Sequence, residues 1–130
     1  MENIDTVLDD LAAGKYLLLT TFRRDATPVP TPVWVMRDGA ALAVWSAADA
    51  GKVQRIRNSG RVTVASCDWR GKPLGASVSG IAEVLTPGAS AHFVALMKRK
   101  YGLAARIGLA GSALRGGSKR MAGIRIRLDR

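Results

Sequence analysis

The sequence has little of several residue types on which protein chemistry often depends. Its 130 residues include one cysteine and one histidine, and aromatic residues make up only 5% of the chain. A single cysteine excludes an internal disulfide. Cys67 and His92 together exclude most zinc sites, as well as any Ser-His-Asp arrangement that is not built on His92. We therefore expect no metal site in this protein.

Long apolar runs are also missing. No run approaches the roughly 18 residues that a membrane-spanning helix needs. The N-terminus is acidic and lacks a basic segment before an apolar stretch, so we expect no secretory signal and a cytoplasmic protein. Hydrophobic residues are 48% and charged residues 23% of the chain, which is typical of a globular protein. Residues 1–130 are expected to form one domain that buries its own core.

Acidic residues become scarce in the second half of the chain. The net charge is +10, and after Trp69 only Glu83 and Asp129 are acidic, whereas twelve residues are basic. Such a field favours an anionic partner, which means nucleic acid, a phosphate or a polycarboxylate. A basic surface that only keeps the protein soluble is the alternative interpretation.

The patterns that are present predict a mainly β protein with peripheral helices. Helices are expected between Asn3 and Gly14, from Ala47 to Ser59 with Asp49 as N-cap, and from Thr86-Pro87 to about Tyr101. Strands are expected at 15–22, 27–37, 40–46, 61–68, 75–85 and 121–128, and residues 102–119 are expected to form a short helix and a basic loop. Six short strands joined mostly by hairpins close most easily as an antiparallel barrel.

Two strands carry more specific expectations. The continuous apolar run of 15–22 suggests burial on both faces. Prolines at 28, 30 and 32 remove backbone donors, so the segment 27–37 should begin as an edge or bulged strand and pair regularly only from about Val33.

The tetrapeptide Thr31-Pro32-Val33-Trp34 is the first candidate binding segment. A strand kinked by proline leaves neighbouring N–H and C=O groups unpaired, and such groups can bind the polar edge of a flat heterocycle. Trp34 as an ordinary core residue is the alternative.

Ser46, Lys52 and Arg55 form the second candidate. Ser46 ends a predicted strand, while Lys52 and Arg55 lie one turn apart on the same face of the next helix. A hydroxyl, a helix N-terminus and two cations favour a phosphate group. A solvated basic helix face is the alternative. No Walker or Gly-x-Gly-x-x-Gly pattern is present, which excludes nucleotide-binding folds of those kinds.

The third candidate is the Gly/Pro loop that follows Cys67. Arg70 and Lys72 in this loop are either anion ligands or plain surface charges. Cys67 is expected to be a small buried strand residue rather than a nucleophile, because its only possible histidine partner, His92, lies on a distant helix. We expect no catalytic function for His92.

Several segments together resemble a known family. They are KYLLLTTFRRD, TPVW, the GKVQRIR helix that leads into a strand ending in CD, the RGKPLG loop and KRKYG. Over about residues 6–128 they are similar to the flavin- and deazaflavin-binding split β-barrel proteins of the pyridoxamine-phosphate-oxidase-like superfamily, and within it to the branch that depends on coenzyme F-420. The segment 103–120 does not match.

This resemblance implies a six-stranded split barrel that forms a homodimer with two cofactor sites at the dimer interface. It implies that Thr31, Pro32, Val33 and Trp34 lie along the deazaflavin ring, that Ser46, Lys52 and Arg55 hold the phosphate, and that no covalent cofactor or metal is needed. An unpaired sheet edge and an apolar face, both of which need cover, also favour a dimer.

The resulting hypothesis is an oxidoreductase that exchanges a hydride between coenzyme F-420 and a small organic substrate. Arg70 and Lys72 would contact the anionic oligoglutamate tail of F-420. The catalytic residues stay unassigned, and the hydroxyl of Tyr101 or a water is the only proton donor we can suggest. Alternatives are an FMN-binding oxidase or reductase of the same fold, a non-catalytic F-420 carrier, and a basic polyanion-binding module. Nucleic acid is the less favoured partner, because the few aromatic residues make no stacking platform.

Overall fold

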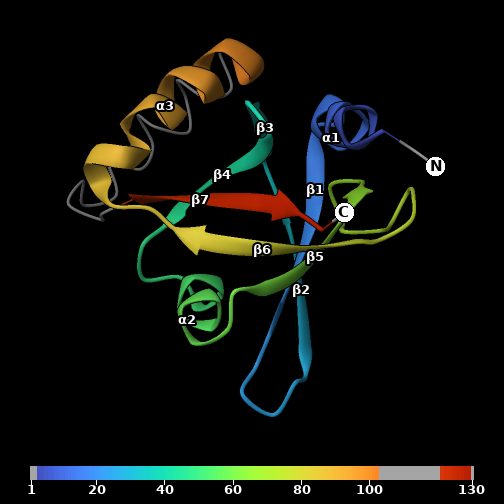
Figure 1. The fold of residues 1–130 in the computed structure, drawn as a ribbon, viewed down its shortest axis with the longest axis vertical. Coiled ribbons are helices and arrows are strands. Elements are labelled where there is room, and N and C mark those ends of the chain that lie inside the picture. The colour runs from blue at the N-terminus through green and yellow to red at the C-terminus, as the bar shows by residue number, and fades with distance from the viewer. Residues whose placement is uncertain (1–2, 103–120, 130) are drawn as a thin grey trace.

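The computed structural model describes residues 3–102 and 121–129. The chain order of its elements is α1 (Ile4–Ala13), β1 (Tyr16–Phe22), β2 (Pro28–Val33), β3 (Met36–Asp38), β4 (Ala41–Ala47), α2 (Gly51–Asn58), β5 (Arg61–Cys67), β6 (Val78–Val84), α3 (Pro87–Tyr101) and β7 (Met121–Leu128). The mainly β class with peripheral helices is therefore confirmed (Figure 1). The helix and loop expected within 103–119 lie outside the described residues.

The strands form one antiparallel sheet in the order β2-β1-β5-β6-β7-β4-β3. Its two outermost strands, β2 and β3, are consecutive in the chain and are separated only by Trp34 and Val35. The sheet therefore curls until its two ends meet at this pair of residues, which we call the seam. The curled sheet is the expected half-open barrel, with seven strands instead of six.

The seventh strand arises because the segment 27–37 is two strands and not one. β2 pairs with β1, whereas β3 pairs with β4 at the other end of the sheet. Between them, the backbone of Val35 bonds to α3 instead of to a strand. Its N–H donates to the Tyr101 hydroxyl at 2.9 Å, and its carbonyl accepts from Lys100 Nζ at 2.7 Å.

Strand β2 is an edge strand, as its prolines predicted, but its pairing is more regular than expected. It pairs with β1 from Pro28 to Val33, so the expectation of regular pairing only from Val33 is wrong. Alternate residues of an antiparallel strand face the same neighbour. The backbone N and C=O groups of Pro28, Pro30 and Pro32 therefore all point to the unpaired edge of β2. The missing N–H groups of these prolines break no ladder hydrogen bond there.

The interior of the barrel holds the main apolar core. Its largest buried members include Leu8, Leu17, Leu19, Leu42, Ile124 and Ile126. α1 contributes Leu8 and Leu11, and α2 contributes Val53 and Ile56, from opposite ends of the barrel (Figure 1). A second cluster, built on Phe93 and Met97, lies between α3 and strands β3 and β4.

Burial along β1 corrects one expectation. Leu17, Leu19 and Thr21 are buried, while the residues between them are only half-buried. The strand thus follows the two-residue period with one fully buried face, because β2 and β5 flank it and no second layer covers its outer face completely.

The helix caps agree with the sequence in two of three cases. The Asn3 side chain accepts from Asp5 N, and the Thr86 hydroxyl accepts from Ala89 N. Asp49 is not an N-cap, because the chain first makes a turn in which Ala50 N donates to Ala47 O. α2 then begins at Gly51 with Ala50 as its N-cap and no side-chain acceptor.

Candidate functional site

The start of α2 brings two cationic side chains to a point where a helix packs on the barrel. Its first N–H groups receive no side-chain cap, so the positive end of the helix dipole stays open to a ligand. Val53 and Ile56 anchor the opposite face of the helix in the core. This leaves Lys52 and Arg55 beside the helix start.

Arg55 is held in place by a buried hydroxyl. Its Nε donates to Thr21 Oγ1 at 2.6 Å, and Thr21 has no exposed surface. The guanidinium then lies across Gly51, where an added Cβ would come within 2.8 Å of Arg55 Nη1. Glycine at this position therefore lets the guanidinium pack directly against the first turn of α2.

Lys52 and Arg55 are brought together without a compensating acid. Partial burial lowers the pKa of Lys52, and the nearby charge of Arg55 lowers it further. In the part of the chain that the structure describes, neither residue forms an ion pair. An anion at this point would relieve the repulsion between the two cations, which is why the pair fits a phosphate group.

Ser46 lies near the end of β4, the strand that leads toward α2. It is buried on the same face of β4 as Leu42 and Val44, and its hydroxyl donates to Ala47 O at 3.2 Å. Ser46 and Thr21 are the buried polar residues of the described chain. No hydrogen bond joins Ser46 to Lys52 or Arg55 among the described residues.

The segment Thr31–Trp34 spans the end of β2 and the first residue of the seam. Thr31 is half-buried, Pro32 is exposed and Val33 is buried. Trp34 packs partly buried against the cluster under α3, and its ring stacks on Tyr101 with centroids 4.2 Å apart. Trp34 thus has a packing role, although part of its ring surface stays accessible.

The loop after β5 is ordered by Asp68. Its carboxylate accepts from the backbone N–H groups of Arg70 and Lys72, both at 2.9 Å. Gly71 has a φ of 86°, and a Cβ there would lie 3.7 Å from Pro32 Cδ. The loop therefore carries Arg70 and Lys72 to the outer face of β2, beside the Thr31–Trp34 segment.

The Lys52–Arg55 pair and the loop that carries Arg70 and Lys72 lie on different surfaces of the chain. Arg55 contacts Thr21, whose side chain faces the barrel interior, whereas Gly71 packs near Leu18 on the outer face. Leu18 and Thr21 are three positions apart in β1, which corresponds to about 10 Å along the strand. The pockets described for this chain, of about 340–440 Å³, are lined by other residues.

Tyr101 and Lys100 close the seam from the end of α3. The Tyr101 hydroxyl accepts from Val35 N–H, and its proton is directed at Lys15 O (2.7 Å) or Val35 O (3.1 Å). Burial raises the pKa of Tyr101 to about 12. Lys100 Nζ donates to the carbonyls of Ala12, Gly14 and Val35. The Tyr101 hydroxyl, which the sequence suggested as a proton donor, is thus already hydrogen-bonded to backbone groups.

The remaining chemically reactive side chains lie elsewhere. Cys67 is buried, as predicted, and burial raises the pKa of its thiol, with the Asp68 carboxylate raising it further. His92 is exposed, with Nε2 2.9 Å from Asp38 Oδ2. Within residues 3–102 and 121–129, no three His, Cys, Asp or Glu side chains gather as a metal site would require, and no helix is long and apolar enough to cross a membrane.

A curled antiparallel sheet closed by a two-residue seam, with helices at both ends, defines the flavin-binding split-barrel class. The sequence model of pyridoxamine 5'-phosphate oxidase matches residues 4–129, and the chain belongs to this family. No curated protein matches the chain in sequence.

Solved structures agree on the fold. A conserved hypothetical protein from Mycobacterium tuberculosis has a TM-score of 0.70 at 20% identity, covering 100% of this chain and 82% of its own. An F-420 reductase gives 0.63 at 20% identity, with coverage of 94% and 93%. An FAD-binding protein from Mesorhizobium loti gives 0.66 at 16% identity, with coverage of 99% and 90%. At such identities the likeness shows the fold alone.

Proposed function

We propose that this protein is an oxidoreductase that uses the deazaflavin coenzyme F-420 as hydride donor or acceptor for a small organic substrate. The observation that carries the proposal is the pairing of Lys52 and Arg55 at the uncapped start of α2, without an acidic partner among the described residues. Two adjacent cations and free helix N–H groups suit the phosphate that F-420 and FMN share.

The free edge of β2 would receive the ring system. Because Pro30 and Pro32 face outward, their carbonyls are offered there without any competing N–H group. A flat heterocycle with an N–H at its edge can donate to such carbonyls. An F-420 ring held at this edge would supply the hydride chemistry, and the chain would orient the ring and keep water away from it.

We further propose that the site is completed by a second copy of the chain. Within one copy, the Lys52–Arg55 pair and the Arg70–Lys72 loop lie on different faces of β1. In addition, Trp69 and Leu74, which both lie between β5 and β6, are 65% and 67% exposed and offer apolar surface to a partner. A homodimer that covers these side chains would also enclose the cofactor.

FMN is the second candidate cofactor. It ends in a single phosphate, for which the Lys52–Arg55 pair is sufficient, and one structural neighbour is an FAD-binding protein. A nucleic-acid platform is not favoured by the arrangement of the tryptophans. Trp34 stacks on Tyr101, the Nε1 atom of Trp45 is buried, and Arg70 lies over the ring of Trp69.

The test compares binding of oxidised F-420 and FMN at equal concentrations by fluorescence quenching. F-420 should bind more tightly than FMN, and Lys52→Ala should weaken F-420 binding by about 1.5–3 kcal/mol, the value of a charge-assisted hydrogen bond. Arg57→Ala is the matched control, since Arg57 is an exposed cation on the same helix. Tighter binding of FMN than of F-420 would show that FMN is the cofactor. Unchanged F-420 binding by Lys52→Ala would show that Lys52 does not hold the phosphate.

F-420 binding alone does not distinguish an enzyme from a carrier. Reduced F-420 should lose its hydride to a suitable substrate in the presence of catalytic amounts of the protein. Tight binding without turnover across a panel of small electrophilic substrates would identify a carrier.

A further inference from the structure

A pocket of about 440 Å³ lies away from α2, on the side of the barrel that α1 covers. Residues of α1, of the turn between β3 and β4, and of the end of β7 form its walls. Its accessible apolar surface comes from Ile4, Ala40 and Leu128, above the buried side chains of Leu8 and Ala41. Its volume falls in the usual range for small-molecule sites.

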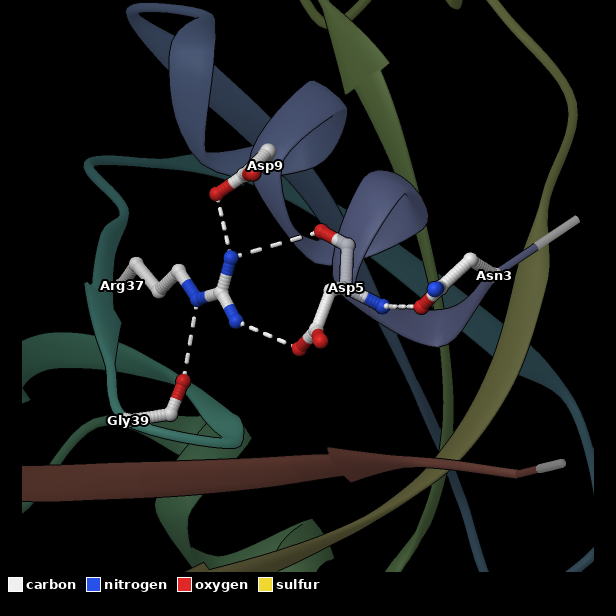
Figure 2. A network of polar contacts seen from close by, with 5 residues as sticks. All are labelled: Asn3, Asp5, Asp9, Arg37 and Gly39. Carbon is white, nitrogen blue, oxygen red and sulfur yellow. Dashed lines mark hydrogen bonds and ion pairs between the residues drawn. The ribbon is translucent and has the colours of Figure 1, made fainter.

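A network centred on Arg37 fixes the walls of this pocket (Figure 2). Its guanidinium donates to both the carboxylate and the backbone carbonyl of Asp5, to the Asp9 carboxylate, and to Gly39 O at 2.9 Å. α1 is thereby tied to the β3–β4 turn. Asp5 and Asp9 are engaged in this network and do not neutralise the cations of the pocket.

Two arginines at the rim of the pocket are only weakly compensated. Arg125 lies 3.8 Å from Asp38 and 3.7 Å from Glu83, distances too long for hydrogen bonds. Asp38 is instead hydrogen-bonded to His92. Arg127 is exposed and forms no ion pair within the described chain. The pocket therefore holds two guanidinium groups against one carboxylate.

We propose that this pocket binds a small organic anion, with a carboxylate head on Arg125 and Arg127 and an apolar body against Ile4, Ala40 and Leu128. Arginine forks match the geometry of carboxylates. Among the described residues, Arg125 has only the two long ion-pair contacts and Arg127 has no ion pair, so both guanidinium groups can still donate hydrogen bonds to a ligand. The apolar lining selects against small inorganic anions, which have nothing to bury. The proposal does not depend on the proposed cofactor or on α2.

The probe is hexanoate, titrated into the ¹⁵N-labelled protein without cofactor and followed by amide NMR. The amides of Ala40, Ala41 and Leu128 should shift saturably, and those around Lys52 and Arg55 should not. Hexanamide, which keeps the body but lacks the charge, should bind at least about tenfold more weakly, as should acetate, which lacks the body. Equal affinity for hexanoate and hexanamide, or shifts centred elsewhere, would overturn the proposal.

Two variants separate the head from the body. Arg127→Met should weaken hexanoate binding about tenfold, whereas Arg99→Met, a change at an exposed cation of α3, should leave it unchanged. Ala40→Phe, at an exposed wall position, should fill the pocket and abolish binding while the thermal midpoint stays near that of wild type. Should Arg127→Met lower stability, Ala40→Phe decides alone, and hexanoate bound as tightly to it as to wild type would refute the site.

Discussion

Replacing Tyr101 by Phe tests whether the end of α3 holds the seam of the barrel closed. The change keeps the aromatic ring that stacks on Trp34 and removes only the hydroxyl that accepts from Val35 N–H at 2.9 Å. A partly buried donor left without an acceptor costs about 1–3 kcal/mol. We expect the free energy of unfolding of Tyr101→Phe to fall by this amount at pH 7.

The assay is equilibrium urea unfolding followed by circular dichroism. With a denaturant slope of about 2 kcal/mol per M, a loss of 2 kcal/mol lowers the urea midpoint by about 1 M. Tyr16→Phe is the control, because the Tyr16 hydroxyl has no hydrogen bond to residues 3–102 or 121–129, and it should change stability by less than about 0.5 kcal/mol.

The pH dependence gives a second, independent readout. Burial raises the pKa of Tyr101 to about 12 in the folded protein, from 10.0 for an unperturbed tyrosine. Between these values the folded state binds more protons than the unfolded state, so this contribution to stability falls as pH rises. The advantage of wild type over Tyr101→Phe should be complete below pH 10 and shrink toward pH 12.

Lys52 and Lys100 change the stability in the opposite direction as pH rises, because burial lowers the pKa of each. Both are present in wild type and in the variant, so the difference between the two proteins isolates Tyr101. A variant as stable as wild type, or a difference that stays constant from pH 9 to 12, would refute the proposed role of the hydroxyl.

Three further predictions concern the proposed site. Sedimentation at micromolar concentration should show a homodimer, with well over about 1,600 Å² buried in total, and a monomer would contradict it. Affinity for F-420 should rise with the number of tail glutamates, by about 0.2–1 kcal/mol for each exposed ion pair that a glutamate forms. Added salt should lower this affinity, because it screens exposed pairs. This gain should be smaller in an Arg70→Ala/Lys72→Ala variant, and equal affinity for tailed and tail-less cofactor would assign these charges to another role. Thr21→Val should weaken F-420 binding by about 0.5–1.5 kcal/mol with little loss of stability, because Arg55 loses the acceptor that orients it. Unchanged binding by Thr21→Val would show that Arg55 needs no such support.

The elements that the sequence predicted well depend on local signals. The side-chain caps at Asn3 and Thr86 begin helices where expected, and the alternation of Ile124, Ile126 and Leu128 marks β7 with its observed bounds. Each of these signals is complete within a few residues. Neighbouring segments could therefore be assigned without knowledge of the tertiary structure.

The errors arise where distant residues decide the local structure. Val35 leaves the strand because its backbone bonds to Tyr101, 66 residues away. No residue pattern within the segment 27–37 predicts this contact with Tyr101. The later start of α2 has a local cause instead, because a turn closed by Ala50 N and Ala47 O precedes the helix.

The candidate site was partly predictable. The spacing of Lys52 and Arg55 placed both on one helix face, and the structure brings them together. The supporting hydroxyl of Thr21 was missed, although the two-residue period of β1 puts it on the buried face with Leu17 and Leu19. A threonine on an otherwise aliphatic buried face was the available signal.

The three prolines of β2 have a consequence for self-association. Continuing a sheet across its edge requires donors as well as acceptors on that edge, and the outward positions of β2 present carbonyls only. A strand added at the free edge of β2 could therefore form only half of the usual backbone hydrogen bonds. β3, at the other end of the sheet, is three residues long and offers little template. Both ends of the sheet thus discourage amyloid-like or end-to-end stacking, and copies of this chain that associate must do so through side-chain surfaces.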